Sequence, residues 1–359
     1  MYSQAMKVLV TGGAGFIGST TCSALEDAGH TPVVLDSLVS GPAAFTRGRL
    51  FYHGDMADTA LVRRIFAEHP DIAATLHFAA RIVVTESVAQ PALYYRENVV
   101  GSLTLFETLL ALGQTRVIFS SSASIYDSPA DLRVDEHSPL KPLSPYARSK
   151  RMTEEMLGDL CAASQDTPSP MRAIALRYFN PVGADPKLRS GPYIADPTHI
   201  LGRLMAAAQG RAEAFEITGT DYATRDGTGL RDYIHIWDLA QAHVAALEGF
   251  EGAFEAAARE GQGEVSFLPI NVGSGNGVTV RELVTAFGAA SPTPITVREG
   301  PRRPGDSAGA YADTTRAQRY LGWTARLTVA EAMESAFAWE AVRGERLNAA
   351  GAQEQQFQP

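Results

Sequence analysis

One glycine-rich segment constrains the fold more than any other part of the chain. Directly after the apolar run at residues 7–10, the sequence continues as Thr-Gly-Gly-Ala-Gly-Phe-Ile-Gly and then enters a helical pattern. Gly12, Gly15 and Gly18 permit a tight turn, a close approach of backbone N–H groups to a pyrophosphate, and close packing of a helix on a strand. A glycine triad placed between a strand and a helix predicts the first turn of a dinucleotide-binding fold.

The rest of the first half alternates short apolar runs with helical stretches. The runs are rich in Val, Ile, Leu and Phe, and they lie at residues 31–36, 50–53, 74–80, 116–120 and 172–179. Between them, apolar residues recur three and four positions apart, as at 19–29 and 59–68. Runs without polar alternation suit strands that are buried on both faces and covered by helices. The expected fold class is therefore α/β, with a Rossmann-type doubly wound parallel sheet.

Two carboxylates follow the second and third apolar runs. Asp36 ends the second run, where it can accept hydrogen bonds from both hydroxyls of a ribose. An acid at that place would repel the 2′-phosphate of NADP, so we expect NAD as the cofactor. Asp55 follows the third run and can either accept from the adenine amino group or cap a helix, and the pattern does not separate these two roles.

The composition excludes several classes of protein. Of the 359 residues, 45% are hydrophobic and 20% are charged, which is enough apolar surface for a core and is not typical of disorder. The net charge is −9, and no run of five like charges offers a surface for nucleic acid or anionic lipid. No apolar run reaches the ~18 residues of a membrane span. We expect a cytoplasmic protein whose partners are small molecules rather than nucleic acid or membrane.

The two cysteines, Cys22 and Cys161, lie in helical contexts without CxxC spacing or neighbouring histidines. We expect both to be buried small apolar residues in a reducing compartment. The pattern of potential ligands predicts no metal site.

A tyrosine and a lysine lie one helical turn apart in the segment at residues 144–150. Tyr146 and Lys150 are four positions apart in a predicted helix, so their side chains share one face. A phenol with a pKa near ~10 is a poor base at neutral pH, but a neighbouring ammonium group and a nicotinamide cation both favour the phenolate. The spacing can also arise by chance in an amphipathic helix. The dinucleotide motif upstream favours a catalytic pair.

A run of hydroxyl side chains follows the strand predicted at residues 116–120. Because the carboxyl ends of parallel strands border the ligand crevice, these hydroxyls are expected to lie in it. Ser122 is the candidate that donates to a substrate oxygen. Ser120 and Ser121 are expected to bond backbone or tyrosine partners instead.

These motifs together resemble the UDP-glucose 4-epimerase family of the extended short-chain dehydrogenases/reductases. The resemblance rests on the glycine triad, the serine-rich strand end and Tyr146 with Lys150. It rests also on Arg-Tyr-Phe-Asn-Pro-Val-Gly-Ala at 177–184 and on Asp-Gly-Thr-Gly-Leu-Arg-Asp-Tyr-Ile-His at 226–235, and it extends over roughly residues 6–343. It implies an isomerase whose tightly held NAD is reduced and reoxidised in each turnover.

The resemblance implies a reaction at C4 of a UDP-hexose. Tyr146 would take the proton of the 4-hydroxyl while hydride leaves C4 for the nicotinamide, and the resulting 4-keto sugar would take hydride back on its other face. Ser122 would steady the oxygen, and Lys150 would bind the nicotinamide ribose. The family also implies a homodimer.

The motifs and the resemblance together assign two sets of binding residues. The cofactor set comprises Gly12, Gly15, Phe16, Ile17, Gly18, Asp36, Asp55, Met56, Phe78, Ala79, Ala80, Asn98, Tyr146, Lys150 and Tyr178. The substrate set comprises Ser122, Ser124, Tyr146, Asn180, His199, Ile200, Arg231, Arg303, Asp306 and Ala310. Within the substrate set, the two arginines suit a diphosphate, which they can bind through charge-assisted forks.

Four positions depart from the usual pattern of the family. Ile82 stands where many members have a lysine near the cofactor phosphates, although Arg81 precedes it. His199 replaces an asparagine, Thr218 replaces an aromatic residue near the uracil, and Asp127 replaces the glycine of the usual Tyr-Gly. These departures concern nucleotide binding and leave the catalytic trio intact.

A further position bears on the range of sugars. Counted back from Ala312 without a gap, Ala310 lies where family members with a bulky tyrosine exclude N-acetylated sugars. A small residue there predicts that UDP-N-acetylhexosamines are also accepted. The alternative is that Tyr311 turns into the pocket.

The composition changes after about residue 181. Residues 181–197 are rich in Pro, Gly and Asp, and a helical stretch follows at 200–209. Residues 250–264 are rich in Glu, Ala and Gly and are expected to form a surface insertion. The expected units are a NAD-binding Rossmann domain at 1–180 with segments returning at about 236–272, a smaller mixed α/β domain at 181–345 that mainly binds the nucleotide sugar, and a disordered tail at 346–359.

Two alternatives remain open from the sequence. Another nucleotide-sugar epimerase, or a dehydratase or decarboxylase, could have the same fold, but a dehydratase needs acids beside the catalytic hydroxyl, and none is present at residues 122–124. A non-catalytic sensor of NAD or nucleotide sugars would keep the fold without the chemistry. The intact Ser122, Tyr146 and Lys150 disfavour a sensor.

Overall fold

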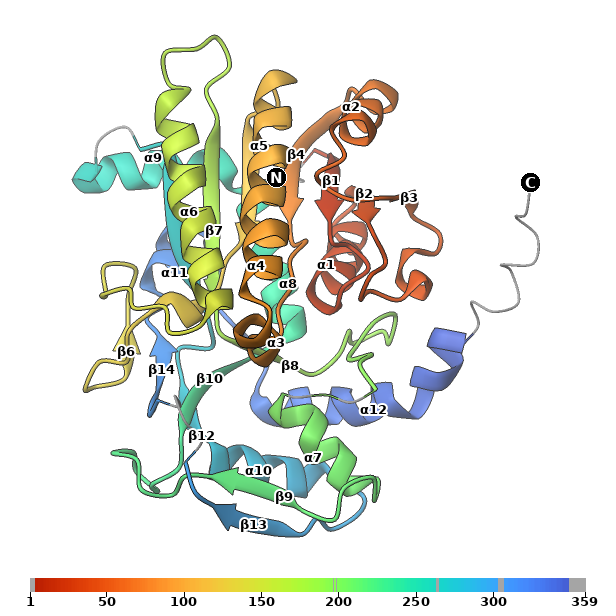
Figure 1. Ribbon diagram of the computed structural model, residues 1–359, viewed down its shortest axis with the longest axis vertical. Helices are drawn as coiled ribbons and strands as arrows, with labels where there is room; N and C mark the ends of the chain where they lie inside the picture. Colours follow the sequence, from red (N-terminus) through yellow and green to blue (C-terminus); the bar gives the residue numbers. More distant parts are fainter. Residues whose placement is uncertain (1–3, 196, 198, 263–264, 303–306, 349–359) are drawn as a thin grey trace.

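A parallel sheet of seven strands forms the larger part of the molecule (Figure 1). The computed structural model describes residues 4–195, 197, 199–262, 265–302 and 307–348. The strand order is β11-β7-β5-β4-β1-β2-β3, and each neighbouring pair is parallel. The bounds are β1 Lys7–Thr11, β2 Thr31–Asp36, β3 Leu50–His53, β4 Ile72–His77, β5 Arg116–Ser120, β7 Arg172–Tyr178 and β11 Phe267–Val272. The predicted α/β fold class is confirmed.

Each strand of this sheet sends alternate side chains into two different hydrophobic cores. Val8 and Val10 of β1 belong to one core, whereas Leu9 between them belongs to the other. Helices α1 (Phe16–Asp27), α8 (Ile236–Glu248), α9 (Phe250–Ala257) and α11 (Thr315–Leu321) contribute to the first core. Helices α2 (Thr59–Glu68), α5 (Gly101–Ala111) and α6 (Pro145–Ala163) contribute to the second. Burial on both faces explains why the strand sequences are continuously apolar.

A smaller mixed part lies beyond the end of the sheet, at the bottom of Figure 1. It holds a five-stranded sheet, a two-stranded sheet and three helices around a third core. The bounds are β6 Arg133–Val134, β8 Asn180–Val182, α7 Ile200–Ala208, β9 Phe215–Thr218, β10 Leu230–His235, β12 Gly277–Thr279, α10 Val280–Ala290, β13 Val297–Gly300, β14 Gly309–Ala312 and α12 Val329–Asn348. Short helices α3 (Val84–Ala89) and α4 (Pro91–Tyr94) precede a π-helical turn at Tyr95–Val100 that runs into α5. Within the described part of the chain, no helix combines the length and the apolar character that crossing a bilayer requires.

The strand predicted at 74–80 is displaced, because β4 ends at His77. The apolar residues at 78–80 leave the sheet and remain partly buried beside the glycine loop. There the backbone N–H of Phe78 donates to the carbonyl of Thr11 at 3.0 Å. Partial burial outside the sheet therefore produced the same apolar signal as a strand. The helix predicted at 19–29 begins earlier, at Phe16.

The segment at 250–264 is not a surface insertion, as its sequence suggested. Its first half is helix α9, and Phe250, Ala253, Phe254 and Ala257 are buried in the same core as α1 and α8. Their spacing of three and four positions is the pattern of a helix with one apolar face. The Glu- and Gly-rich composition of the opposite face obscured this signal.

One further part of the chain differs from the expected organisation. Helix α12 extends to Asn348, so the first residues of the predicted tail at 346–359 are helical, and residues 349–359 lie outside the described part. Strand β11 adds a seventh strand beside β7, and it lies within the segment at about 236–272 that was expected to return to the Rossmann part. Both cysteines are fully buried in helices as predicted, and burial raises the pKa of each thiol to about 12.

We expect Phe254→Ala to destabilise the protein by about 3–5 kcal/mol, because the ring is 5% exposed and its removal leaves a cavity. The matched control is Glu255→Ala on the exposed face of the same helix, expected to change stability by less than about 0.5 kcal/mol. Urea unfolding of both variants checks this. Equal small effects would show that α9 does not support the core.

Candidate active site

A cavity of about 590 Å³ borders the carboxyl ends of the parallel strands. Most residues predicted to bind cofactor or substrate line it, and they are Gly12, Gly15, Phe16, Ile17, Gly18, Asp36, Asp55, Met56, Phe78, Ala79, Ala80, Lys150, Tyr178, Asn180, His199, Ile200 and Arg231. Ser122 and Tyr146 are each 8% exposed and lie next to this wall rather than in it. Arg303 and Asp306 lie outside the described residues. One cavity thus brings together residues of both predicted binding sets.

The glycine loop forms the end of the cavity at the N-terminus of α1. Gly12 has φ +73°, and a Cβ there would lie 2.6 Å from the backbone nitrogen of Ala79. A Cβ on Gly18 would lie 2.2 Å from the carbonyl oxygen of Gly12. The first turn of α1 contains no acidic residue and no side-chain cap, so its backbone N–H groups suit an anion. This end of the cavity fits the pyrophosphate of a dinucleotide.

The carboxylate of Asp36 is held at the end of β2 by two backbone groups. Its Oδ2 accepts from the N–H of Ala14 at 2.9 Å, and its Oδ1 accepts from the N–H of Leu38 at 2.8 Å. Each oxygen keeps a lone pair that can accept from a ribose hydroxyl. Asp55 does not cap a helix, because Asp58 caps α2 by accepting from the N–H of Leu61. The helix-cap interpretation of Asp55 is therefore wrong, and its carboxylate lies at the cavity.

The candidate catalytic side chains come from α6 and from the end of β5. Nζ of Lys150 donates to the carbonyl of Ser120 at 2.8 Å. The hydroxyl of Ser122 donates to Oγ of Ser124 at 2.9 Å and lies close enough to the phenol of Tyr146 to lower its pKa. The structure thus brings Ser122, Tyr146 and Lys150 to one point, where β5 ends against the first turns of α6.

Burial governs the protonation of both groups on α6. It raises the pKa of the Tyr146 phenol above its usual range, and the hydrogen bond with Ser122 opposes this shift. It also lowers the pKa of Lys150 to about 7, while Glu154 acts in the opposite direction. The sequence predicted that Lys150 would lower the pKa of the phenol. In the protein alone, desolvation is the larger effect.

The two serines before Ser122 have different partners. Ser120 donates its hydroxyl to the phenol oxygen of Tyr178 at 2.8 Å, which is the kind of partner predicted for it. Ser121 donates instead to the carboxylate of Glu154. The prediction of a backbone or tyrosine partner for Ser121 is therefore wrong.

A buried histidine connects the glycine loop to α5. Thr11 Oγ1 lies 2.7 Å from Nδ1 of His77, and Nε2 of His77 lies 2.8 Å from the hydroxyl of Ser102. Because Ser102 donates its proton to the carbonyl of Asn98, Nε2 must donate and Nδ1 must accept from Thr11. Burial lowers the pKa of His77 to about 3, so the ring is neutral. This arrangement fixes the strand end from which the glycine loop begins.

Asn98 is 2% exposed and lies behind the cavity wall. Its amide donates to the carbonyl of Arg81 and to Oγ of Ser149, and its carbonyl oxygen accepts from the N–H of Arg81. It therefore connects the segment after β4 to α6. That Asn98 also touches a cofactor stays a prediction.

The substrate half of the cavity is built from β8, α7, β9 and β10. Nδ1 of His199 accepts from the N–H of Gly202 and so caps α7, which leaves the ring proton on Nε2. Burial lowers the pKa of this ring. Arg231 donates to the carbonyls of Leu230 at 2.8 Å and Ala308 at 3.1 Å. Arg231 thus supports the backbone that leads into β14 as well as lining the cavity.

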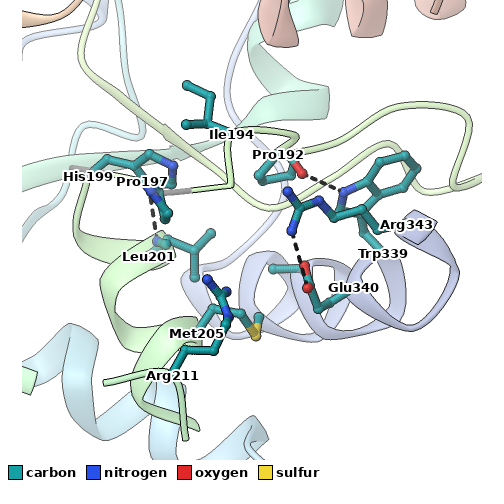
Figure 2. Close-up of a pocket in the computed structure, with 12 residues that line it drawn as sticks. Pro192, Ile194, Pro197, His199, Leu201, Met205, Arg211, Trp339, Glu340 and Arg343 are labelled. Atoms are coloured by element: carbon teal, nitrogen blue, oxygen red, sulfur yellow. Dashed lines mark hydrogen bonds and ion pairs between the residues drawn. The ribbon is translucent and has the colours of Figure 1, made fainter. Parts of the chain in front are cut away.

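The wall at residues 192–194 is anchored by helix α12, as Figure 2 shows. Nε1 of Trp339 donates to the carbonyl of Pro192 at 2.8 Å, and Arg343 donates to the carbonyl of Tyr193 at 2.7 Å. A small second cavity of about 30 Å³ lies on this side and shares Pro192, Ile194 and His199 with the large one. The position of the wall therefore depends on a helix distant in sequence.

Several lining residues were missed by the sequence reasoning. Arg203 on α7 lies at the cavity, with its guanidinium carbon 5.7 Å from the ring centroid of Phe215, and Glu216 follows on β9. Neither the glycine triad nor any catalytic spacing marks these positions, although Arg203 is a cation in the helix that His199 caps. Arg81 also lines the cavity beside Ile82, and it lies 3.5 Å from the carboxylate of Glu86. Among the described residues, no group of His, Cys, Asp and Glu is arranged to hold a metal ion.

A doubly wound sheet with a glycine loop and a Ser-Tyr-Lys group at its carboxyl edge defines a class of nucleotide-dependent enzymes that move a hydride and a proton. A family model described as "NAD dependent epimerase/dehydratase family" matches residues 8–256. The chain belongs to this family.

Named relatives match over nearly the whole chain. A UDP-glucose 4-epimerase of Rhizobium meliloti is 39% identical over 342 residues, which cover 95% of this chain and 99% of the relative. The crystal structure of a UDP-glucose 4-epimerase from Stenotrophomonas maltophila with bound NAD and formylated UDP-arabinopyranose has a TM-score of 0.86 at 35% identity, covering 95% and 99% of the two chains. A Bifidobacterium longum UDP-glucose 4-epimerase in complex with NAD+ and UDP has a TM-score of 0.81 at 35% identity, covering 94% and 98%. The resemblance predicted from the motifs is confirmed.

We expect Lys150→Met to remove one component of the pH dependence of stability. The pKa of Lys150 is about 7 in the folded protein and 10.5 ordinarily, so between these values the unfolded chain binds more protons and the stability due to Lys150 rises with pH. The stability of the parent minus that of the variant should rise by about 1.4 kcal/mol per pH unit from pH 7 to 9. Urea unfolding of both proteins at several pH values measures this difference in stability. A difference that does not change with pH would contradict the burial assigned to Lys150.

Proposed function

We propose that this chain is a UDP-glucose 4-epimerase that binds NAD and interconverts UDP-glucose and UDP-galactose. The observation that carries the proposal is one cavity that joins the glycine loop, which fits a dinucleotide, to Asn180 and Arg231, and that Lys150 and Tyr178 also line. Ser122 and Tyr146 lie next to this part of its wall. A cofactor and a nucleotide sugar bound end to end would bring their reactive carbons together there.

The residues of the chain supply binding and proton transfer. NAD held by the glycine loop and Asp36 would supply a nicotinamide able to take up a hydride from C4 of the sugar and to give it back. Tyr146 takes the proton of the 4-hydroxyl as that hydride leaves, and gives a proton back when the hydride returns. Ser122, which adjoins Tyr146, is assigned to donate to the same oxygen of the sugar. The cation of Lys150 favours the phenolate form of Tyr146 against the effect of burial.

The proposed binding roles follow the position of each residue along the cavity. We assign the cofactor pyrophosphate to the glycine loop, its adenosine ribose to Asp36 and its nicotinamide to the region of Phe78 and Tyr178. We assign the diphosphate of the UDP-hexose to Asn180 and Arg231, with the predicted Arg303 and Asp306 completing the nucleotide site. In the same proposal, the larger sheet is the cofactor domain and the mixed part is the substrate domain.

The proposal includes a cellular setting. We propose a homodimer in the cytoplasm, acting on a UDP-hexose and without nucleic acid or membrane partners. The support is the family relationship together with the net charge of −9 and two buried free thiols.

We expect Tyr146→Phe to lose about 10²–10⁴-fold or more in turnover while keeping its fold and its affinity for NAD, because only the proton-transferring hydroxyl is removed. Separating UDP-glucose from UDP-galactose after incubation of purified protein measures the activity. Tyr52→Phe, on β3, serves as the control and should turn over normally. No interconversion by the parent protein would overturn the proposed function, and near-normal turnover of Tyr146→Phe would overturn the role of the phenol.

The position of Ala310 supports a wider range of sugars. Ala310 pairs with Arg231 across two parallel strands and packs against a small cluster that includes Tyr126 and Phe179. Successive strand residues face opposite sides, so Tyr311, which pairs with Arg133, has its side chain on the other face of β14. Neither residue lines the cavity, but this alternation puts Ala310, and not Tyr311, on the face of the sheet that it shares with the cavity residue Arg231. We therefore propose that UDP-N-acetylglucosamine and UDP-N-acetylgalactosamine are also interconverted.

We expect Ala310→Tyr to reduce turnover of the N-acetylated pair by about tenfold or more and that of the plain hexoses by only a few fold, because the added ring competes with the acetamido group. Tyr311→Phe is the matched control and should leave the ratio of the two activities unchanged. Assays of both substrate pairs give that ratio. Equal loss of both pairs, or a parent protein inactive on N-acetylated sugars, would contradict the assignment.

A further inference from the structure

Three side chains at four-residue intervals follow one face of α6. They are Tyr146, Lys150 and Glu154, and all three are buried. The proposed mechanism uses the first two and leaves the third without a role. Glu154 is 3% exposed, and a buried carboxylate needs partners that compensate its lost hydration.

The partners of Glu154 come from two strands of the sheet. Nε and Nη2 of Arg177 on β7 donate to the carboxylate at 3.0 Å and 2.6 Å. Ser121, next to Ser122 at the end of β5, donates to it as well. Arg177 also donates to the phenol of Tyr126 at 2.9 Å. The carboxylate of Glu154 thus joins α6 to the strand end that presents Ser122.

The surroundings of Lys150 contain little other compensation for its charge. Nζ donates to the carbonyl of Ser120, and it lies 4.9 Å from the ring centroid of Phe119. The titratable groups nearest this region are Tyr146 and Glu154 of α6, His77 of β4, and Tyr178 and Arg177 of β7. Two more carboxylates, Glu97 and the Arg81-paired Glu86, line the same cavity as Lys150 from elements packed against α6. At neutral pH the histidine and both tyrosines carry no charge, and Arg177 is paired with Glu154.

We propose that Glu154, held by Arg177 and Ser121, is a positioning residue for the epimerase reaction: it fixes the catalytic face of α6 against the end of β5 and keeps Lys150 protonated beside Tyr146. The proposal rests on the proposed function, because it assigns Glu154 a role in that same reaction. Glu154 acts through Lys150 and needs no contact with substrate.

The electrostatics of Lys150 agree with this geometry. Burial lowers the pKa of Lys150 to about 7, and the charge of Glu154 is what opposes the shift. Without that charge, Lys150 would lose its proton at lower pH. Tyr146, whose pKa burial already raises, would then lose the cation that favours its phenolate.

The first test is the pH profile of Glu154→Gln, measured as kcat and KM for UDP-galactose across pH 6 to 9. We expect the basic limb of the kcat profile to move to lower pH by about one unit or more. At pH 8, kcat should fall about tenfold, while KM should stay within about threefold of the parent value. Glu155→Gln is the matched control on the next position of α6, where the exposed side chain pairs with Arg151. Its profile should coincide with that of the parent. An unchanged limb in a folded Glu154→Gln variant would overturn the proposal.

A second variant separates positioning from simple support of the fold. Glu154→Gln leaves the buried Arg177 without its partner, which can unfold the protein. The double variant Glu154→Gln/Arg177→Met removes both charges, and thermal melting checks its fold. We expect it to recover stability but to keep the shifted limb and the low kcat. Recovery of the parent profile in the double variant would show that Glu154 only supports the fold.

Ser121→Ala provides a third measurement that retains all the charges. It removes one hydrogen bond to Glu154, so we expect the limb to stay in place and kcat to fall by only a few fold. If the basic limb of the kcat profile moved in Ser121→Ala, the shift in Glu154→Gln could not be assigned to the loss of the Glu154 charge. All three measurements require that the parent protein interconverts UDP-glucose and UDP-galactose. If the parent is inactive, the proposed function fails. If the parent is active and Glu154→Gln has the same pH profile as the parent, only the role of Glu154 is refuted.

Discussion

The parallel register of the seven-stranded sheet is the constraint on which the candidate site depends. Parallel strands end at one edge, so the glycine loop after β1, Asp36 after β2 and the serines of β5 meet there although they are far apart in sequence. Antiparallel strands would divide the same residues between two edges. Helices on both faces bury the sheet and leave this edge as the place where polar groups can meet a ligand.

The sequence predicted most of this sheet because its signals are local. The glycine triad, the apolar runs and the four-residue spacing of Tyr146 and Lys150 each lie within one or two elements. Contacts between distant elements left no such signal, and this is why the partner of Ser121 and the anchoring of Pro192 by Trp339 were missed. The pKa of Tyr146 was also predicted in the wrong direction for the protein alone, since a helical spacing gives the distance to Lys150 but not the desolvation of the phenol. The burial of α9 was missed although its apolar spacing was visible.

Consecutive serines at the end of β5 show how one strand terminus can organise several groups. Ser120 bonds Tyr178 through its hydroxyl and Lys150 through its carbonyl, Ser121 bonds Glu154, and Ser122 adjoins Tyr146. Small hydroxyl residues suit this position because they bring a donor close to the backbone without filling the crevice. A shift of β5 against α6 would therefore disturb three of these partners at once, because Tyr146, Lys150 and Glu154 are all on α6.

The anchoring of the substrate wall by α12 has a consequence for the order in which the molecule is completed during synthesis. Six strands of the large sheet are made by residue 178, but β11 at its edge follows only at 267–272. Trp339 and Arg343, which hold the wall at 192–194, are translated later still. Domains usually fold from the N-terminus as they emerge from the ribosome. The dinucleotide end of the cavity can therefore be buried only once α8, α9, β11 and α11 have followed, and the opposite wall is fixed later still, after translation has passed residue 343.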